Sequence, residues 1–268
     1  VHVHQDCLSS VILRAAAQHN IPVRIAHSHN ANQDKNLKYP IKLWYKRSIP
    51  KYTTNLFACG KDAGDWMFGG APYQIINNAI DATAYSFNPK KRIEMRHQLG
   101  LADKLIIGHV GRFNPQKNHL FLLDIFAALL KKEPNAVLLL VGGGEDMLKI
   151  QAKAHALGIA EHVRFLGVRS DVADLMQAMD VFVFPSLYEG LGIVLIEAQA
   201  AGLPCVVSDT IPREAYLTDL VTAERLSSST ETWADNILEK RNFPRIDRRA
   251  EIAAHGFDIT TEAVKLQE

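Results

Sequence analysis

The sequence FPSLYEGLGIVLIEA, residues 184–198, contains the end of a strand, a glycine-bearing turn and the start of a helix. An apolar, β-branched run ends at Phe184, and the helical pattern opens near Ile193. In open α/β sheets, ligands bind at the carboxyl ends of strands. The stretch therefore predicts a ligand site on a parallel α/β sheet.

The turn and the helix start in this stretch are suited to an anion. Gly190 and Gly192 let the backbone approach a ligand closely, and the free N–H groups of the helix near Ile193 form an anion site with a favourable dipole. A pyrophosphate would fit there. Glu189 and Glu197 are spaced E-x7-E, and carboxylates this close to an anion would repel it unless they have a role of their own. Either glutamate alone also fits a solvated or helix-capping carboxylate.

A second segment, residues 108–118, supplies positive charge. Gly108 to Arg112 ends a strand, and Gln116-Lys117-Asn118 precedes the next helix, so two cations lie at one strand's carboxyl edge. Arg112 offers a planar fork and Lys117 a compact ammonium, which suits the developing charge of a nucleoside diphosphate leaving group. The pair would replace a divalent metal.

Metal and dinucleotide motifs are missing from the sequence. No Asp-x-Asp occurs, and neither His2/His4 nor His27/His29 is accompanied by a convincing third ligand, so we expect no metal site and no cofactor. In the turn Gly142-Gly143-Gly144, Met147 occupies the place of the third glycine of a dinucleotide fingerprint. The pattern disfavours NAD and P-loop nucleotide sites.

Apolar runs alternate with helical segments along the whole chain, which predicts two doubly wound parallel α/β sheets. Asn88-Pro89 lies in a linker-like segment, so we expect a first domain over 1–85, a second over 86–245 and a C-terminal helical segment, 246–268, that packs toward the first domain. Four strands are few for such a sheet, and Val1 starts within a strand pattern, so we expect the first domain to be incomplete. The expected strands are near 1–4, 21–26, 54–58 and 73–76, then 104–110, 135–141, 162–166, 180–184, 204–207 and 220–223.

Bulk properties exclude several classes of protein. The 268 residues carry a net charge of +1, so no global field would gather nucleic acid. The composition, 47% hydrophobic and 22% charged, is typical of a soluble protein. Three scattered cysteines without a CxxC pair favour a reducing compartment, and we expect a cytoplasmic protein.

Taken together, these motifs resemble the retaining family-4 glycosyltransferases of the GT-B fold, especially the bacterial branch that builds capsules and exopolysaccharides. The resemblance implies two Rossmann-like domains that face a cleft, a UDP-sugar or other NDP-sugar as co-substrate, and a lipid-linked or oligosaccharide acceptor. It is carried by His27-Ser28-His29-Asn30, Asn77 to Asp81, Gly111-Arg112, Gln116-Lys117-Asn118, Gly142 to Gly144, Phe165-Leu166-Gly167 and the E-x7-E segment through Pro204.

The resemblance also implies roles for individual residues. Arg112 and Lys117 would hold the diphosphate, Glu197 would accept hydrogen bonds from the ribose hydroxyls, and Glu189 would lie near the donor sugar, which His27 would face from the first domain. A loop-capping role for His27 stays open. The expected catalytic residues are His27, Arg112, Lys117 and Glu189, and the expected donor-binding residues are Gly111, Arg112, Lys117, Gly143, Val168, Arg169, Glu189, Gly190, Leu191, Gly192, Ile193, Val194 and Glu197.

Two features depart from the family pattern. Its Asn-Gly-Ile-Asp turn reads Asn78-Ala79-Ile80-Asp81 here, and its N-terminal glycine-rich loop is absent. Metal-independent sugar transfer with retention is the expected activity of the enzyme, a hexosyltransferase. A nucleotide-sugar epimerase or hydrolase, or a nucleotide-binding fragment without catalysis, are the alternatives.

A basic and aromatic segment, Lys35 to Tyr52, suggests a membrane-facing surface. Lysines recur there at three- and four-residue steps, and a helix from about Pro40 would place Lys42 and Lys46 together. Such a face could rest on anionic lipid at the inner side of the cell membrane, although a solvated helix face gives the same pattern.

Overall fold

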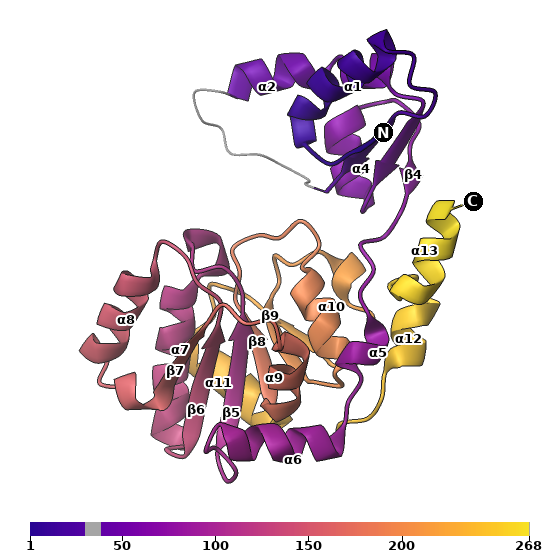
Figure 1. Ribbon diagram of the computed structural model, residues 1–268. Coiled ribbons are helices and arrows are strands. Elements are labelled where there is room, and N and C mark those ends of the chain that lie inside the picture. The colour runs from indigo at the N-terminus through magenta and orange to yellow at the C-terminus, as the bar shows by residue number, and fades with distance from the viewer. Residues whose placement is uncertain (30–38, 268) are drawn as a thin grey trace. The chain divides into compact units, whose positions relative to one another are not determined.

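The computed structural model describes residues 1–29 and 39–267 (Figure 1). These residues form two compact units, which are described separately below. The first unit comprises residues 1–79 with the chain from Thr261 onward, and the second comprises Ile80–Thr260. Among the described residues, no helix is both long enough and apolar enough to cross a membrane.

The first unit contains a four-stranded parallel sheet in the order β1-β2-β3-β4. The strand expected at 21–26 forms later, at 25–28, because Pro22 has no N–H to donate to a sheet ladder. The strands are β1 (His2–Val3), β2 (Ile25–Ser28), β3 (Asn55–Ala58) and β4 (Gln74–Ile75); the helices are η1 (Asp6–Leu8), α1 (Ser9–Gln18), α2 (Tyr39–Lys46), α3 (Ile49–Tyr52), α4 (Lys61–Phe68) and α13 (Ile259–Gln267).

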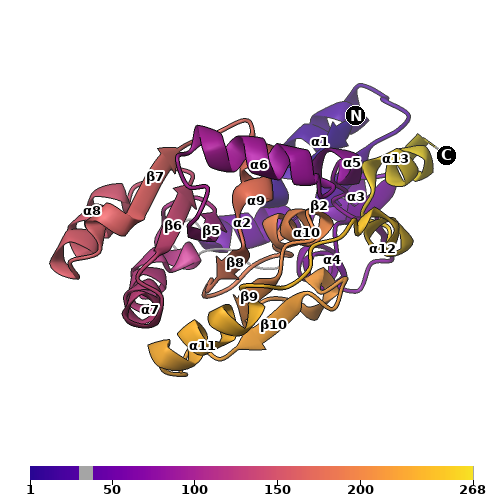
Figure 2. The same cartoon turned by 90° about the horizontal axis from the view of Figure 1, so that it is seen from below.

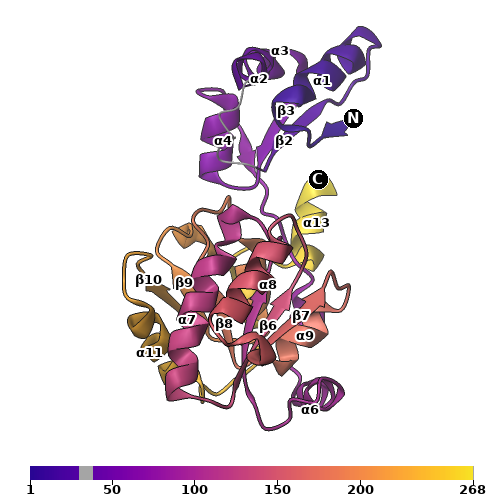
Figure 3. The same ribbon diagram turned by 90° about the vertical axis from the view of Figure 1, so that its left-hand side faces the viewer.

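One face of this sheet carries the core of the first unit. Val3 and Ala26 pair in register and pack with Leu13 of α1 and Met67 of α4, and Figure 3 shows these helices next to β2 and β3. Because side chains alternate along a strand, residues one position away face the other side of the sheet. The opposite face therefore presents His2, His27 and Phe57.

The second unit contains a six-stranded parallel sheet in the order β10-β9-β8-β5-β6-β7. The chain runs from β5 to β7 in one direction and then returns to pair β8 with β5, so the strand order reverses between these two strands. The strands are β5 (Leu105–Val110), β6 (Ala136–Val141), β7 (Val163–Gly167), β8 (Val181–Phe184), β9 (Cys205–Ser208) and β10 (Val221–Glu224).

Helices cover both faces of the second sheet, as Figure 2 shows for α7 and α11 on one side and α6, α9 and α10 on the other. The buried strands are almost entirely apolar, as expected for a parallel sheet with two covered faces. The helices are α5 (Ala82–Tyr85), α6 (Pro89–Gln98), η2 (Pro115–Lys117), α7 (His119–Lys132), α8 (Met147–Ala156), η3 (Ala160–His162), α9 (Val172–Ala178), α10 (Ile193–Ala200), η4 (Arg213–Ala215), α11 (Thr230–Lys240) and α12 (Arg249–Ala254).

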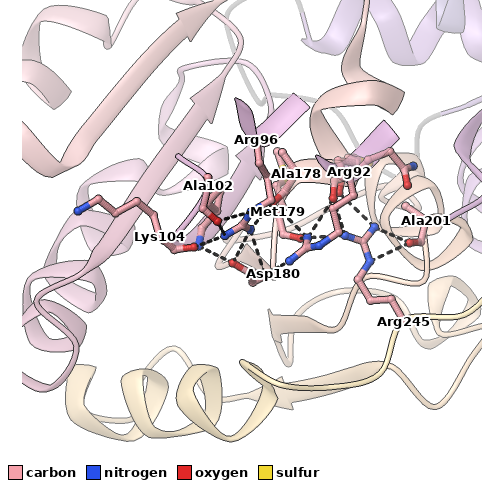
Figure 4. Close-up of polar contacts among 12 residues, drawn as sticks. Arg92, Arg96, Ala102, Lys104, Ala178, Met179, Asp180, Ala201 and Arg245 are labelled. Atoms are coloured by element: carbon pink, nitrogen blue, oxygen red, sulfur yellow. Dashed lines mark hydrogen bonds and ion pairs between the residues drawn. The ribbon is translucent and has the colours of Figure 1, made fainter. Parts of the chain in front are cut away.

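A cluster of arginines holds the chain that leads into β8 (Figure 4). Arg92 and Arg96 of α6 both form ion pairs with Asp180, whose carboxylate also accepts from the N–H of Ile106 at 2.7 Å. Arg245, far away in sequence, donates to the carbonyl oxygens of residues 176, 177, 179 and 201. The cluster therefore fixes β8, and with it the loop that follows, against α6 and the chain after α11.

Candidate functional site

The two loops singled out in the sequence follow β5 and β8, the strands at which the strand order reverses. Ligands of doubly wound sheets bind at such a reversal, outside the carboxyl ends of the strands. The loops are joined directly: the N–H of Leu187 donates to the carbonyl of Gln116 at 2.8 Å, and Nδ2 of Asn118 donates to the carbonyl of Pro185 at 3.1 Å. Residues 71 and 67 positions apart in sequence thus form one surface.

Lys117 and Glu189 form an ion pair across this junction. Nζ of Lys117 lies 2.7 Å from Oε1 of Glu189, and the side chains are only 15% and 7% exposed. Nε2 of Gln116 donates to Oε2 of Glu189 at 3.3 Å, and the ammonium of Lys117 stands 4.7 Å from the centre of the Phe184 ring. Both charges are therefore held in place. An anionic ligand would compete with Glu189 for Lys117.

Arg112 is placed differently from Lys117. Its side chain is 71% exposed and pairs with Glu145 at 3.3 Å. An exposed ion pair of this kind contributes little to stability, so the guanidinium can turn toward a ligand at small cost. Both cations expected from the sequence follow β5, but only Lys117 is already fixed in the protein.

The glycine turn after β6 packs backbone against backbone on the Arg112 loop. The N–H of Gly111 donates to the carbonyl of Val141 at 3.0 Å, and the N–H of Phe113 to that of Gly143 at 2.9 Å. Gly142 has φ of +133°, and a Cβ there would lie 2.0 Å from the carbonyl oxygen of Gly111. Only glycine allows this approach, which brings the turn beside Arg112.

Val168 and Arg169, expected near the base, follow β7. Val168 is exposed, and a Cβ added to Gly143 would lie 3.3 Å from its Cγ2, so these two residues are neighbours. Arg169 pairs with Asp171 at 2.6 Å. In strand order, the residues after β6 and β7 lie one and two strands from β5, which extends the expected site along the sheet edge.

Glu197 lies about one turn into α10, the helix that follows the glycine-bearing turn. Gly192 adopts φ of +84° at the N-cap of α10, and the first N–H groups of the helix, from Ile193 and Val194, have no acceptor within the helix. Burial raises the pKa of Glu197, and a hydrogen bond from the Tyr85 hydroxyl opposes that rise. Leu191 beside this turn is buried in the core.

A pair of buried histidines lies close to Lys117. Nδ1 of His109 lies 2.8 Å from the carbonyl oxygen of Val183, and its ring centre is 4.6 Å from that of His119. Burial, followed by the charge of Lys117, lowers the pKa of His119 to about 4, and burial lowers the pKa of His109 as well. Both rings are therefore neutral at pH 7 and leave Lys117 as the cation of this junction.

His27 lies in the first unit, at the end of β2, and is 7% exposed. Its Nδ1 is 3.2 Å from Nε2 of His2, and one ligand atom from each of His2, His4 and His27 lies within 4.8 Å of the others. The expectation that neither histidine pair has a third ligand is therefore wrong. The cause is register, because β1 and β2 are adjacent parallel strands that bring the two pairs side by side.

The sequence did not assign roles to three residues that the structure places in contact with expected site residues. Gln116 holds Glu189, Asn118 joins the two loops, and Tyr85 donates to Glu197. Gln116 and Asn118 flank Lys117, so their position next to a predicted residue was an available signal. Tyr85 had no such signal, because it is distant from Glu197 in sequence.

Comparison with known proteins identifies the family. Residues 91–239 match the family model of glycosyl transferases group 1, which is more than half of the chain. The chain belongs to this family. It is 38% identical over 247 residues to a putative glycosyltransferase, EpsF, of Bacillus subtilis, a match that covers 88% of the chain and 64% of EpsF. The chain thus spans about two thirds of the length of that relative.

Further similarities agree with this assignment. A UDP-Gal:alpha-D-GlcNAc-diphosphoundecaprenol alpha-1,3-galactosyltransferase of Escherichia coli is 27% identical over 78% of the chain and 57% of its own length. The crystal structure of Anabaena HepE in complex with UDP and glucose superposes with a TM-score of 0.82 at 22% identity, covering 99% of this chain and 76% of HepE. The expected GT-B fold of family-4 glycosyltransferases is confirmed.

Proposed function

We propose that the second unit binds a UDP-sugar and that the protein transfers the sugar to a polysaccharide precursor with retention of configuration. The observation that carries the proposal is the junction at the strand-order reversal. There the buried pair Lys117–Glu189 and the N-terminus of α10 occupy the carboxyl edge of β5 and β8. Membership of the glycosyl transferase family supports the same function.

In this proposal the diphosphate binds at the N-terminus of α10. The first N–H groups of that helix and its dipole favour an anion, and Gly190 and Gly192 leave the backbone accessible. Lys117 and Arg112 stabilise the charge that develops on the leaving diphosphate, a role often filled by cations held in place before reaction. The leaving diphosphate and the incoming acceptor share one face of the sugar, which gives retention without a covalent intermediate.

Glu197 and Glu189 have different roles. The carboxylate of Glu197 has two acceptor oxygens, which suits the two vicinal hydroxyls of a ribose. Glu189 is held by Lys117 and Gln116 and lies near the donor sugar in this proposal. When the diphosphate binds, Lys117 exchanges Glu189 for phosphate oxygens, and Gln116 retains the freed carboxylate.

The base and the acceptor are inferred from named relatives. HepE has been crystallised in complex with UDP-glucose, and the Escherichia coli relative is named for a UDP-Gal donor and a diphosphoundecaprenol-linked acceptor. A 100-residue match, 42% identical, is to the Vi polysaccharide biosynthesis protein of Salmonella typhi. We therefore propose uridine as the base, with the backbone near Val168 and Arg169 as its contact, and a lipid-linked polysaccharide precursor as the acceptor.

Calorimetric titration with UDP, GDP and ADP tests the donor site. We expect UDP to bind most tightly and Glu197→Gln to weaken it about 10–100-fold, because a hydrogen bond to a charged group contributes ~1.5–3 kcal/mol. Glu161→Gln, an exposed change at the opposite end of β7, is the matched control and should bind UDP normally. Equal UDP affinity in the two variants would rule out the ribose role of Glu197.

We further propose that the face of α2 in the first unit contacts anionic lipid. Trp44 is 67% exposed and Ile41 is also exposed, while Lys42 and Lys46 lie on the same helix. Other exposed apolar residues occur on η1 and α1, which pack against α2: Leu8, Val11 and Ile12. Lys35 and Lys38, part of the surface expected from the sequence, lie outside the described residues.

Vesicle co-sedimentation tests this surface. The chain should sediment with phosphatidylglycerol vesicles but not with phosphatidylcholine vesicles, and added salt should release it, because attraction between lysines and anionic lipid is screened. Ile41→Ser/Trp44→Ser should lose the binding, whereas Leu148→Ser, a change of a still more exposed apolar residue on α8, should keep it. Unchanged sedimentation of the double variant would contradict the proposal.

A further inference from the structure

Four histidines gather at the carboxyl ends of β1 and β2 in the first unit. His2 and His4 alternate on one strand and its extension, and His27 and His29 do the same on the neighbouring strand, so all four rings lie on one face of the sheet. Neighbouring rings are close, with centres 4.3 Å apart for His2 and His4 and 4.3 Å apart for His27 and His29. The edge of Phe57 packs against His2 and His27.

The spacing of the ring nitrogens matches that of metal ligands. Nε2 of His2 is 3.2 Å from Nδ1 of His27, and three ligand atoms, from His2, His4 and His27, all lie within 4.8 Å of one another. Two nitrogens bound to one tetrahedral Zn²⁺ at ~2.0–2.1 Å lie about 3.3 Å apart. The three histidines therefore need only small ring rotations to share an ion.

The chemistry of the cluster also favours a metal ion. The three side chains are all imidazoles, and imidazole is the commonest metal ligand in proteins. Imidazole ligands without thiolates suit Zn²⁺, Ni²⁺ and Cu²⁺.

We propose that His2, His4 and His27 form a binding site for a divalent first-row transition ion, with Zn²⁺ as the expected occupant. His29 is the positioning residue of this site. Its Nε2 lies 2.7 Å from Nδ1 of His4, and a hydrogen bond of this kind fixes the tautomer and orientation of a metal-binding ring. The site would join β1 to β2 through their side chains. The site shares no residue with the donor site proposed for the second unit, Lys117, Glu189 and Glu197, which uses no metal.

Titration of the tag-free, chelator-treated chain with Co²⁺ tests the site. One equivalent should produce the intense visible absorption of tetrahedral Co²⁺, and one equivalent of Zn²⁺ should abolish it. Zn²⁺ should also raise the thermal midpoint of the chain, and EDTA should reverse the rise, because an ion that binds only the folded state stabilises it.

Variants locate the ion. His29→Gln removes a residue that only hydrogen-bonds a ligand, and it should weaken Zn²⁺ binding by ~10–100-fold. His2→Gln/His4→Gln removes two ligands and should weaken Zn²⁺ binding by more than that. His97→Gln/His155→Gln removes two exposed histidines of the second unit and should bind Zn²⁺ as the parent does. The single variant His4→Gln, at an exposed position, provides the same test if the double variant does not fold.

Two results would overturn the proposal. One is a parent chain that shows no Co²⁺ absorption. The other is a folded His2→Gln/His4→Gln variant, verified by circular dichroism, that binds Zn²⁺ as tightly as the parent. UDP binding by the second unit is unaffected by either result, so failure of the metal site and failure of the donor site are distinguishable.

Discussion

Glu197 is a half-buried carboxylate whose charged form is needed by its proposed ligand. Burial raises its pKa above the ordinary value of 4.5, and the Tyr85 hydroxyl, which donates to the carboxylate, limits the rise. A ribose diol binds the ionised form, so affinity is present above this pKa and is lost as the pH falls through it. As the pH falls, we therefore expect the affinity for UDP-glucose to begin to decline at a higher pH than it would if Glu197 had the ordinary pKa of a glutamate.

The variant Tyr85→Phe tests this assignment. Removing a donor to the charged form raises the pKa of Glu197 further, so the pH at which affinity halves should move upward. Titrations of UDP-glucose between pH 4 and pH 8 (~0.5 unit steps) measure the shift, since the phosphates of this ligand do not titrate there. Tyr73→Phe, which removes a donor to Asp65 in the first unit, is the control. A midpoint that stays in place or moves downward would refute the role of Tyr85.

At the residue scale, local sequence predicts which residues follow the strands but not which partners they find. Lys117 and Glu189 were expected near a ligand, and their loops do lie together, because parallel strands end at one edge. Their mutual ion pair and the contact with Gln116 depend on the pairing of β5 with β8, which no local pattern encodes. The histidine cluster was missed for the same reason: it arises only when β1 pairs with β2.

At the element scale, the turn after β6 depends on a backbone approach that only glycine permits. Gly142→Ala places a Cβ 2.0 Å from the Gly111 carbonyl oxygen and requires φ of +133° from a residue with a side chain. The Arg112 loop must then move, so we expect a loss of stability and weaker UDP binding. Gly158→Ala is the control, because Gly158 has φ of +69° with open space around its Cα.

Urea unfolding of the two variants distinguishes the cost of a positive φ at alanine from the cost of the steric clash of its Cβ. A left-handed alanine costs ~1–2 kcal/mol, which is the whole effect expected at Gly158. At Gly142 the collision should add ~1–3 kcal/mol, the usual cost of overpacking. Equal losses at the two positions would show that the turn can relax away from the Arg112 loop.

The strands themselves were largely predictable. All six strands of the second unit lie within a residue or two of their expected positions, because buried parallel strands are continuous β-branched runs bounded by turn residues. The strand expected at 21–26 is displaced to 25–28, and here the apolar run was misleading. Ile21 to Val23 precede the strand and are not paired with β3. The backbone N–H of Arg24, the residue just before β2, donates to the hydroxyl of Thr54.

At the scale of the whole molecule, the compact units are closed by contacts between distant parts of the chain. The expected limit at residue 85 used local features, whereas the second unit begins at Ile80, whose N–H donates to the carbonyl of Phe257 at 2.9 Å. Arg245 acts similarly: it connects the chain after α11 to the end of α9 and to Ala201 after α10. Neither contact has a signal in the sequence.

Arg245 provides the last prediction, on the stability of the second unit. Its guanidinium donates to four carbonyl oxygens, and burial followed by the charge of Arg92 lowers its pKa to about 9, so it is still charged at pH 7. Arg245→Met removes this donor from all four carbonyls; those of residues 177 and 179 keep Arg92 as a donor, whereas those of residues 176 and 201 lose the guanidinium altogether. Because loss of one partner from a buried charged network costs ~3–5 kcal/mol, we expect a decrease of that size in the free energy of unfolding.

The fluorescence of Trp233 measures this decrease in the second unit. Trp233 is fully buried on α11, and substituting Trp44 and Trp66 by phenylalanine leaves it as the sole tryptophan of the chain. Arg249→Met is the control, since Arg249 forms an exposed pair with Asp247 that should contribute less than ~1 kcal/mol. If Arg245→Met unfolds at the same urea concentration as Arg249→Met, the cluster around β8 does not depend on Arg245, and Arg92 and Arg96 with Asp180 are sufficient to hold the strand that leads into the donor loop.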